Sequence, residues 1–102
     1  MLLSGSCHCK KIGFTLLSSH TYPFNLCYCE ICRKTAGGGG YAINLGGDAS
    51  SLQVEGSEYL SIYRAKFIDH DGVSHVSSAE RRFCKVCGSA LWLWDPSWPE
   101  LI

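Results

Sequence analysis

The sequence has no excess of charge of either sign. Its nine Lys and Arg residues balance nine Asp and Glu residues, so the formal net charge at pH 7 is zero. A protein that binds nucleic-acid phosphates or an anionic membrane surface usually carries a clustered excess of basic residues. The balance therefore predicts that neither nucleic acid nor a membrane is a partner.

Long hydrophobic runs are also lacking. No segment approaches the roughly 20 apolar residues that a membrane-spanning helix needs. The first six residues, MLLSGS, contain neither the charged start nor the longer apolar stretch of a secretory signal peptide. These features predict an intracellular, cytoplasmic protein.

Isolated cysteines are the third absence. All seven cysteines fall in three short motifs, Cys7-His8-Cys9, Cys27-Tyr28-Cys29-Glu30-Ile31-Cys32 and Cys84-Lys85-Val86-Cys87-Gly88. Inside the cell, clustered thiols are metal ligands more often than disulfides, and an odd cysteine count would leave one thiol over in a disulfide framework. The pattern favours metal sites over an oxidised, cross-linked protein.

The 102 residues predict one small domain, residues 1–102. Apolar residues make up 46% and charged residues 18%, which is typical of a globular chain rather than a disordered one. A domain of this size often depends on metals or disulfides for its stability.

Alternating apolar and polar residues predict an all-β fold of short strands. The predicted strands are 12–16, 41–45, 52–54, 59–63 and 90–94, with 52–54 and 59–63 expected to form a hairpin across Gly56-Ser57. Loops are predicted at 4–10, 20–25 and 69–72. Residues 30–36 predict about one helical turn, ended by the glycines at 37–40.

The terminal cysteine pairs predict a structural zinc site. Cys7 and Cys9 are two residues apart, so in an extended segment both sulfurs point to one face. Cys84 and Cys87, followed by Gly88, have the form of a zinc knuckle, in which the glycine takes a backbone conformation closed to other residues. Four thiolates suit a tetrahedral zinc that ties the two ends of the domain together.

The central run predicts a second zinc site. Cys27 and Cys29 can share a face, and Cys32 returns to them if a turn starts at Cys29. Three thiolates leave one coordination position open, as catalytic zinc requires. The alternative is a second structural zinc, whose fourth ligand would be His8, His20, His70, His75 or Glu30.

The spacing also permits another partition of the cysteines. Cys27 or Cys29 could pair with Cys84 and Cys87, which would leave the N-terminal pair in the open site. The even number of cysteines in the terminal motifs makes the first partition simpler.

Two basic residues follow the central run directly. Arg33 and Lys34 could clamp the carboxylates of an anionic ligand, although a solvated basic face fits them equally well. Both interpretations also apply to Arg64, Lys66, Arg81 and Arg82. The three tryptophans, Trp92, Trp94 and Trp98, are expected to pack as core and closing edge.

The cysteine motifs, with their neighbours, resemble a known family. Gly5-Ser6-Cys7-His8-Cys9, the central run through Arg33, and Arg82-Phe83-Cys84-Lys85-Val86-Cys87-Gly88-Ser89 are similar to the glutathione-dependent formaldehyde-activating enzyme (Gfa)/centromere-protein-V (CENP-V) family, over roughly residues 4–94. The resemblance implies an Mss4-like all-β fold of small twisted antiparallel sheets stabilised by zinc. It also implies a structural zinc on Cys7, Cys9, Cys84 and Cys87, and a catalytic-type zinc on Cys27, Cys29 and Cys32.

The family's activity joins glutathione to formaldehyde, giving S-hydroxymethylglutathione, and is classed as a carbon–sulfur lyase. The expected substrates are therefore a thiol such as glutathione and a small aldehyde. The alternative is a non-catalytic Mss4-like zinc module that binds a protein partner through its aromatic edge.

The sequence departs from the family pattern at two places. Lys10 stands where the family commonly has glycine after Cys-His-Cys. The sequence also ends at Ile102, shortly after the last predicted strand, where relatives usually continue, so a short or absent C-terminal tail is expected.

Overall fold

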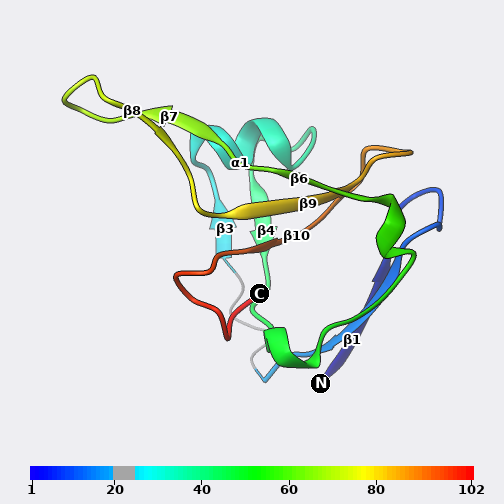
Figure 1. The fold of residues 1–102 in the computed structure, drawn as a ribbon. Coiled ribbons are helices and arrows are strands. Elements are labelled where there is room, and N and C mark those ends of the chain that lie inside the picture. The colour runs from blue at the N-terminus through cyan, green and yellow to red at the C-terminus, as the bar shows by residue number, and fades with distance from the viewer. Residues whose placement is uncertain (20–24) are drawn as a thin grey trace.

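The computed structural model describes residues 1–19 and 25–102, and most of their regular structure is β-strand (Figure 1). The strands are β1 (Leu2–Ser6), β2 (Gly13–Leu17), β3 (Asn25–Cys27), β4 (Ala42–Asn44), β5 (Gln53–Glu55), β6 (Leu60–Tyr63), β7 (Lys66–Ile68), β8 (Ser74–Val76), β9 (Glu80–Cys84) and β10 (Ala90–Trp94). The helical elements are α1 (Glu30–Thr35) and the 3-10 turns η1 (Ala49–Ser51) and η2 (Ser57–Tyr59). The predicted all-β class is confirmed. The loop expected at 20–25 falls, for residues 20–24, outside the described residues.

The first sheet has the antiparallel order β1-β2-β5. The β1–β2 hairpin runs in register from Leu2 opposite Leu17 to Ser6 opposite Gly13. The strand predicted at 12–16 is confirmed, but the loop predicted from residue 4 is wrong because residues 2–6 form β1. The small residues of β1 suit the strand because their neighbours are large: a Cβ atom on Gly5 would collide with the Phe14 ring on β2.

The second sheet has the antiparallel order β10-β9-β6. Its strand β6 pairs with β9, whereas β5 pairs with β2, so the predicted hairpin between 52–54 and 59–63 is wrong. Between β5 and β6, Gly56 takes a positive φ of 79° and caps η2, and this turn carries the chain from one sheet to the other. A sequence with two short strands and a polar turn between them does not reveal such a change of sheet.

The two sheets meet at one end of the molecule. The Phe14 ring on β2 packs edge-on against Trp92 on β10, with the ring centroids 5.1 Å apart. The most deeply buried cluster is Cys7, Ile12 and Cys84, with Val54, Tyr59, Leu60 and Leu91 among the side chains packed on it. The small core of the domain therefore coincides with the loops that carry the terminal cysteines.

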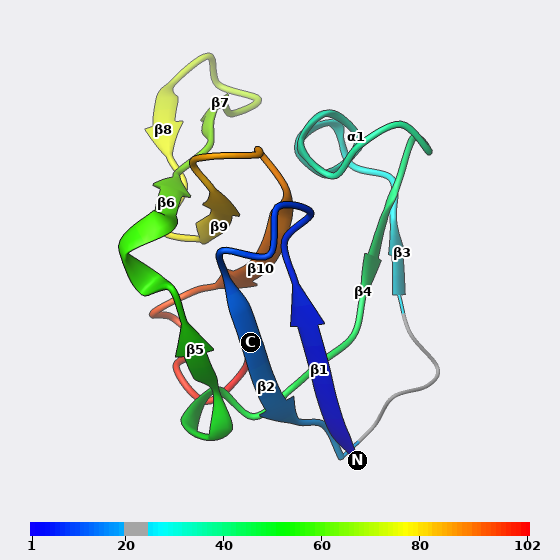
Figure 2. The same cartoon turned by 90° about the vertical axis from the view of Figure 1, so that its right-hand side faces the viewer.

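Two further ribbons lie outside these sheets. β3 pairs with β4, and α1 follows β3 at one end of this ribbon (Figures 1 and 2). β7 pairs with β8 around the turn predicted at 69–72, and this ribbon projects from the body of the molecule.

The tryptophan prediction is right for two of the three residues: Trp92 and Trp94 are half-buried, but Trp98 is exposed. No helix in the described part of the chain is long and apolar enough to cross a membrane.

Candidate metal centres

Two hairpin loops bring the terminal cysteines together. Cys7 and Cys9 lie in the loop between β1 and β2, and Cys84 and Cys87 lie at the turn between β9 and β10 (Figure 2). All four sulfur atoms lie within 4.8 Å of one another. The loops are also joined by a hydrogen bond from the His8 N–H to the Ser89 hydroxyl, at 3.0 Å.

The geometry of this terminal cluster fits zinc. The Sγ atoms of Cys7 and Cys9 are 3.5 Å apart, and those of Cys9 and Cys84 are 3.8 Å apart. Tetrahedral zinc with Zn–S bonds of about 2.3 Å separates its sulfur ligands by about 3.8 Å. All seven cysteines of the chain are free, so no disulfide competes for these sulfurs.

Left-handed residues end both turns of the terminal cluster. Gly88 has a φ of 78° and donates its N–H to the Cys84 carbonyl at 2.8 Å, as expected of a zinc knuckle. Lys10 has a φ of 65° and donates its N–H to the Cys7 carbonyl at 3.1 Å. Lys10 is the one non-glycine residue with positive φ in the described chain.

Backbone N–H groups point at the sulfurs of the terminal cluster. Ile12 donates to the Cys7 sulfur at 3.4 Å, and Val86 and Cys87 donate to the Cys84 sulfur at 3.4 and 3.5 Å. Such contacts stabilise thiolate charge. The hydrogen bond with the Ser89 hydroxyl likewise lowers the pKa of Cys87 to about 5.

The central cluster is built on a strand and a helix start. Cys27 ends β3, and Cys29 is the N-cap of α1, where its sulfur accepts the Cys32 N–H at 3.3 Å. The predicted turn beginning at Cys29 is therefore present, and it returns Cys32 to the other two cysteines. The three sulfur atoms lie within 4.8 Å of one another.

The thiols of the central cluster differ in acidity. The hydrogen bond from the Cys32 N–H lowers the pKa of Cys29 to about 7. Burial raises the pKa of Cys32 to about 11, although Arg81 opposes this shift. Ligation of a metal ion requires the thiolate forms, so metal binding at this cluster must release protons.

None of the fourth ligands considered from the sequence joins the central cluster within the described residues. Glu30 pairs with Lys34 on α1 at 3.2 Å, and His75 binds Asp69 at 2.6 Å in the β7–β8 ribbon. His8 and His70 are exposed, and His20 lies outside the described residues. The other partition of the cysteines is not the grouping seen, because the described sulfurs form one group of four and one of three.

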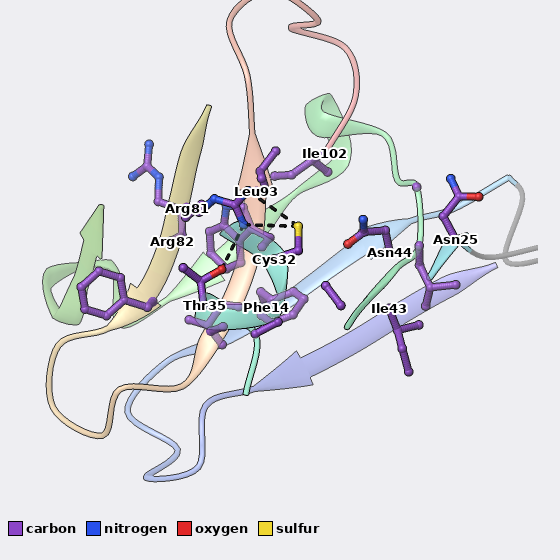
Figure 3. Close-up of a pocket in the computed structure, with 18 of the residues that line it drawn as sticks. Phe14, Asn25, Cys32, Thr35, Ile43, Asn44, Arg81, Arg82, Leu93 and Ile102 are labelled. Carbon is purple, nitrogen blue, oxygen red and sulfur yellow. Dashed lines mark hydrogen bonds between the residues drawn. The ribbon is translucent and has the colours of Figure 1, made fainter. Parts of the chain in front are cut away.

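A cavity of about 1140 Å³, lined mainly by apolar side chains, borders the central cluster. Cys32 faces it together with Arg81, a residue of the central strand β9 (Figure 3). Arg33 and Lys34, the basic residues singled out from the sequence, are exposed on α1 and are not part of this lining. In the sequence Arg81 was only one of four further basic residues that could clamp a ligand, because its approach to Cys32 depends on how β9 and α1 pack.

Arg81 makes direct contact with the central cluster. Its two terminal nitrogens lie 3.7 Å from the Cys32 sulfur, and Nη1 also donates to the Thr35 hydroxyl at 3.2 Å. That hydroxyl donates in turn to the Ile31 carbonyl at 2.7 Å, which orients its acceptor lone pairs.

The fold and the two clusters define a small β-sheet domain with two cysteine-only groups that could each bind a metal ion. The model of the family "Glutathione-dependent formaldehyde-activating enzyme" matches residues 2–102. The chain belongs to this family.

Individual relatives agree with this assignment. A protein of Halomonas elongata named "Putative glutathione-dependent formaldehyde-activating enzyme" is 61% identical over 102 residues. The match covers the whole of this chain, which spans 62% of the length of that relative. A crystal structure of a Rhodobacter sphaeroides protein matches with a TM-score of 0.70 and 25% identity, over 97% of this chain and 80% of the other.

Proposed function

We propose that residues 1–102 form a single zinc-binding domain that adds a thiol such as glutathione to formaldehyde or another small aldehyde. The reaction forms a carbon–sulfur bond, and its reverse is that of a carbon–sulfur lyase. The family description and the name of the Halomonas elongata relative both support this substrate pair. The seven free cysteines suit the reducing environment of the cytoplasm, where we expect the protein to act.

One observation carries the proposal: the central cluster offers three sulfurs, and one of its residues, Cys32, lines a cavity. Within the described chain no fourth His, Asp or Glu ligand joins Cys27, Cys29 and Cys32. Zinc with three protein ligands keeps a position for substrate, where it would hold a thiol as the more nucleophilic thiolate. The proposed roles of Cys27, Cys29 and Cys32 are therefore those of ligands, and the substrate thiol would be the fourth.

We assign the terminal cluster a structural role. Cys7, Cys9, Cys84 and Cys87 provide four thiolates, which fill the coordination sphere of zinc and leave no position for substrate. Cys7 and Cys84 are also buried in the core and do not line the cavity that Cys32 faces.

Arg33 and Lys34 remain proposed contacts for the carboxylates of the substrate. Both lie in the last turn of α1, about one helical turn from the Cys29 cap. Lys34 would have to leave its exposed ion pair with Glu30, which costs little because such surface pairs are weak.

The Cys32→Ser variant tests the central site. We expect thiol-dependent consumption of formaldehyde to fall at least about 100-fold, because loss of a ligand should cost no less than loss of a residue that only supports one. The far-ultraviolet circular dichroism should be unchanged, and about one zinc per chain should remain bound at the terminal cluster. Unchanged turnover in a variant that has lost the central zinc would contradict the proposal.

Cobalt substitution separates the enzyme from a non-catalytic zinc module. Cobalt bound to thiolates absorbs in the visible range, and glutathione should change the spectrum of the central site if it occupies the fourth position. A spectrum that does not respond to any thiol would instead support the module that binds a protein partner.

A further inference from the structure

Arg81 is held rigidly beside the central cluster. It lies on β9, the middle strand of its sheet, where it is paired with Tyr63 of β6 and Leu93 of β10. Its guanidinium bridges from the Cys32 sulfur to the Thr35 hydroxyl (Figure 3). The sheet and the helix therefore fix the position of this cation before any ligand arrives.

The positive charge of Arg81 is not matched by a carboxylate in the described chain. Glu80, its neighbour on β9, binds Arg82 at 2.6 Å and Arg64 at 3.1 Å instead. Asp95 also lines the cavity, but its carboxylate accepts hydrogen bonds from Ser78 and Ser97. The guanidinium of Arg81 is thus free to compensate negative charge at the cysteines.

The two clusters stabilise their sulfurs differently. Backbone N–H groups, which are dipoles without net charge, point at the sulfurs of the terminal cluster. In the central cluster one backbone N–H donates to Cys29, and Arg81 adds a full positive charge at Cys32. Among the described contacts, Arg81 is the charged side chain that reaches a cysteine sulfur.

Charge explains why the central cluster needs this cation. Three thiolates around a divalent zinc leave one negative charge, and a fourth thiolate from the substrate doubles it. Excess charge is costly in a partly buried site unless a nearby group compensates it. A guanidinium donating to one of the sulfurs offsets the added charge and withdraws electron density from the metal–sulfur bond.

We propose that Arg81 is a positioning residue that makes the central cluster receptive to an anionic fourth ligand, the thiolate of the substrate. Arg81 acts through Cys32 and not by binding the carboxylates of the thiol. Thr35 helps to hold Arg81 in place, because its hydroxyl accepts a hydrogen bond from Nη1 of Arg81. This inference rests on the zinc chemistry proposed above for the central cluster.

The test uses the cobalt-substituted protein and two thiol probes, glutathione and 2-mercaptoethanol, which has no carboxylate. In Arg81→Gln, whose side chain keeps hydrogen-bond donors but has no charge, both thiols should bind about 10- to 100-fold more weakly, as judged from the visible spectrum. The metal content should stay at the wild-type value. Arg81→Lys should bind both thiols with intermediate affinity, because it keeps the charge but loses the forked geometry.

Arg64→Gln is the matched control. Arg64 carries the same charge and lies next to β6 in the same sheet region, but its contact is with Glu80, which also has Arg82 as a partner. This variant should bind both thiols as the wild type does. If Arg81→Gln does not fold, Thr35→Val provides a second test. This variant keeps Arg81 but removes the hydroxyl that accepts from its Nη1. It should weaken the binding of both thiols, to a smaller extent than Arg81→Gln.

Two results would overturn the inference while leaving the proposed function intact. One is wild-type affinity for both thiols in Arg81→Gln. The other is weaker binding of glutathione alone, which would make Arg81 a carboxylate contact. If the wild-type protein itself responded to neither thiol, the proposed function would fail and this inference with it.

Discussion

At the scale of single residues, the terminal cluster depends on two left-handed backbone positions. Gly88 takes this conformation without strain, since glycine has no Cβ atom. Lys10 has a Cβ atom, so the same left-handed conformation costs it roughly 1–2 kcal/mol relative to the right-handed region. The hydrogen bond from Lys10 to the Cys7 carbonyl and the closure of the hairpin hold it there.

Lys10→Gly should therefore stabilise the domain. We expect a gain of about 1 kcal/mol in the free energy of unfolding, because relief of strain exceeds the extra entropy of the unfolded chain. Urea denaturation at a constant concentration of free zinc measures this change in the free energy of unfolding. Lys11→Gly is the control: its backbone is not left-handed, and it loses a Lys11 contact over the Tyr59 ring at 5.1 Å, so it should destabilise. Equal effects of the two variants would argue against strain at Lys10.

The residues that the sequence predicted well are those whose partners are close in the chain. The spacing of Cys29 and Cys32 implied a helix start, and Gly88 implied a knuckle, because each is a local feature. Arg81 was only one of several arginines in the sequence. Its contact with Cys32 spans 49 residues and depends on the packing of a sheet against a helix.

At the scale of elements, the β7–β8 ribbon is held by its own turn. The Asp69 carboxylate accepts the N–H groups of Asp71 and Val73, both at 2.9 Å, and binds His75 at 2.6 Å. The hydrogen bond with His75 is the main cause of the lowered pKa of Asp69. Since the folded-state pKa is lowered, this contribution is present above a pH of about 4 and is lost as the pH falls through the lowered value.

Asp69→Ala should loosen this ribbon alone. The amides of Asp71 and Val73 lose their acceptor, so their hydrogen exchange should accelerate on the order of tenfold, measured by nuclear magnetic resonance at neutral pH. Metal content should not change. Asp71→Ala removes a largely exposed carboxylate from the same turn and should leave these rates nearly unchanged. A general rise in exchange over both sheets would show that the ribbon is not an independent element.

The strands were easier to predict than their partners. Alternation correctly indicated β2, β4, β5, β6 and β10, but β5 and β6 were expected to pair with each other. Alternation reports which residues share a face and says nothing about which strand lies alongside. In the sequence, Gly56-Ser57 resembles a hairpin turn. In the structure, Gly56 has a positive φ and the chain passes there from the first sheet to the second.

At the scale of the whole molecule, little apolar surface holds the domain together. Of the five buried apolar residues in the described chain, Cys7, Cys32 and Cys84 belong to the cysteine clusters, and only Ile12 and Ala65 do not. The radius of gyration is 14.0 Å, whereas a compact domain of this length has roughly 13 Å. A metal ion bound at the terminal cluster would therefore supply much of the stability.

Removal of zinc should accordingly unfold the domain. Binding of a structural zinc contributes on the order of 10 kcal/mol, comparable to the whole stability of a small domain. Excess chelator, or the Cys84→Ser substitution, should abolish the dispersion of the amide resonances. Cys32→Ser should preserve it, because Cys32 lines the cavity and does not belong to the buried cluster of Cys7, Ile12 and Cys84. A chelated protein that kept its native spectrum would show that the apolar contacts suffice.

The two clusters also differ in how far apart their ligands lie along the chain. The central cysteines fall within six consecutive residues, whereas the contact between Cys9 and Cys84 spans 75 residues. As the polypeptide leaves the ribosome, the central run can capture a metal ion early, while the N-terminal pair must wait for Cys87 to be synthesised. The order of synthesis therefore completes the three central cysteines 52 residues or more before the last two cysteines of the terminal cluster.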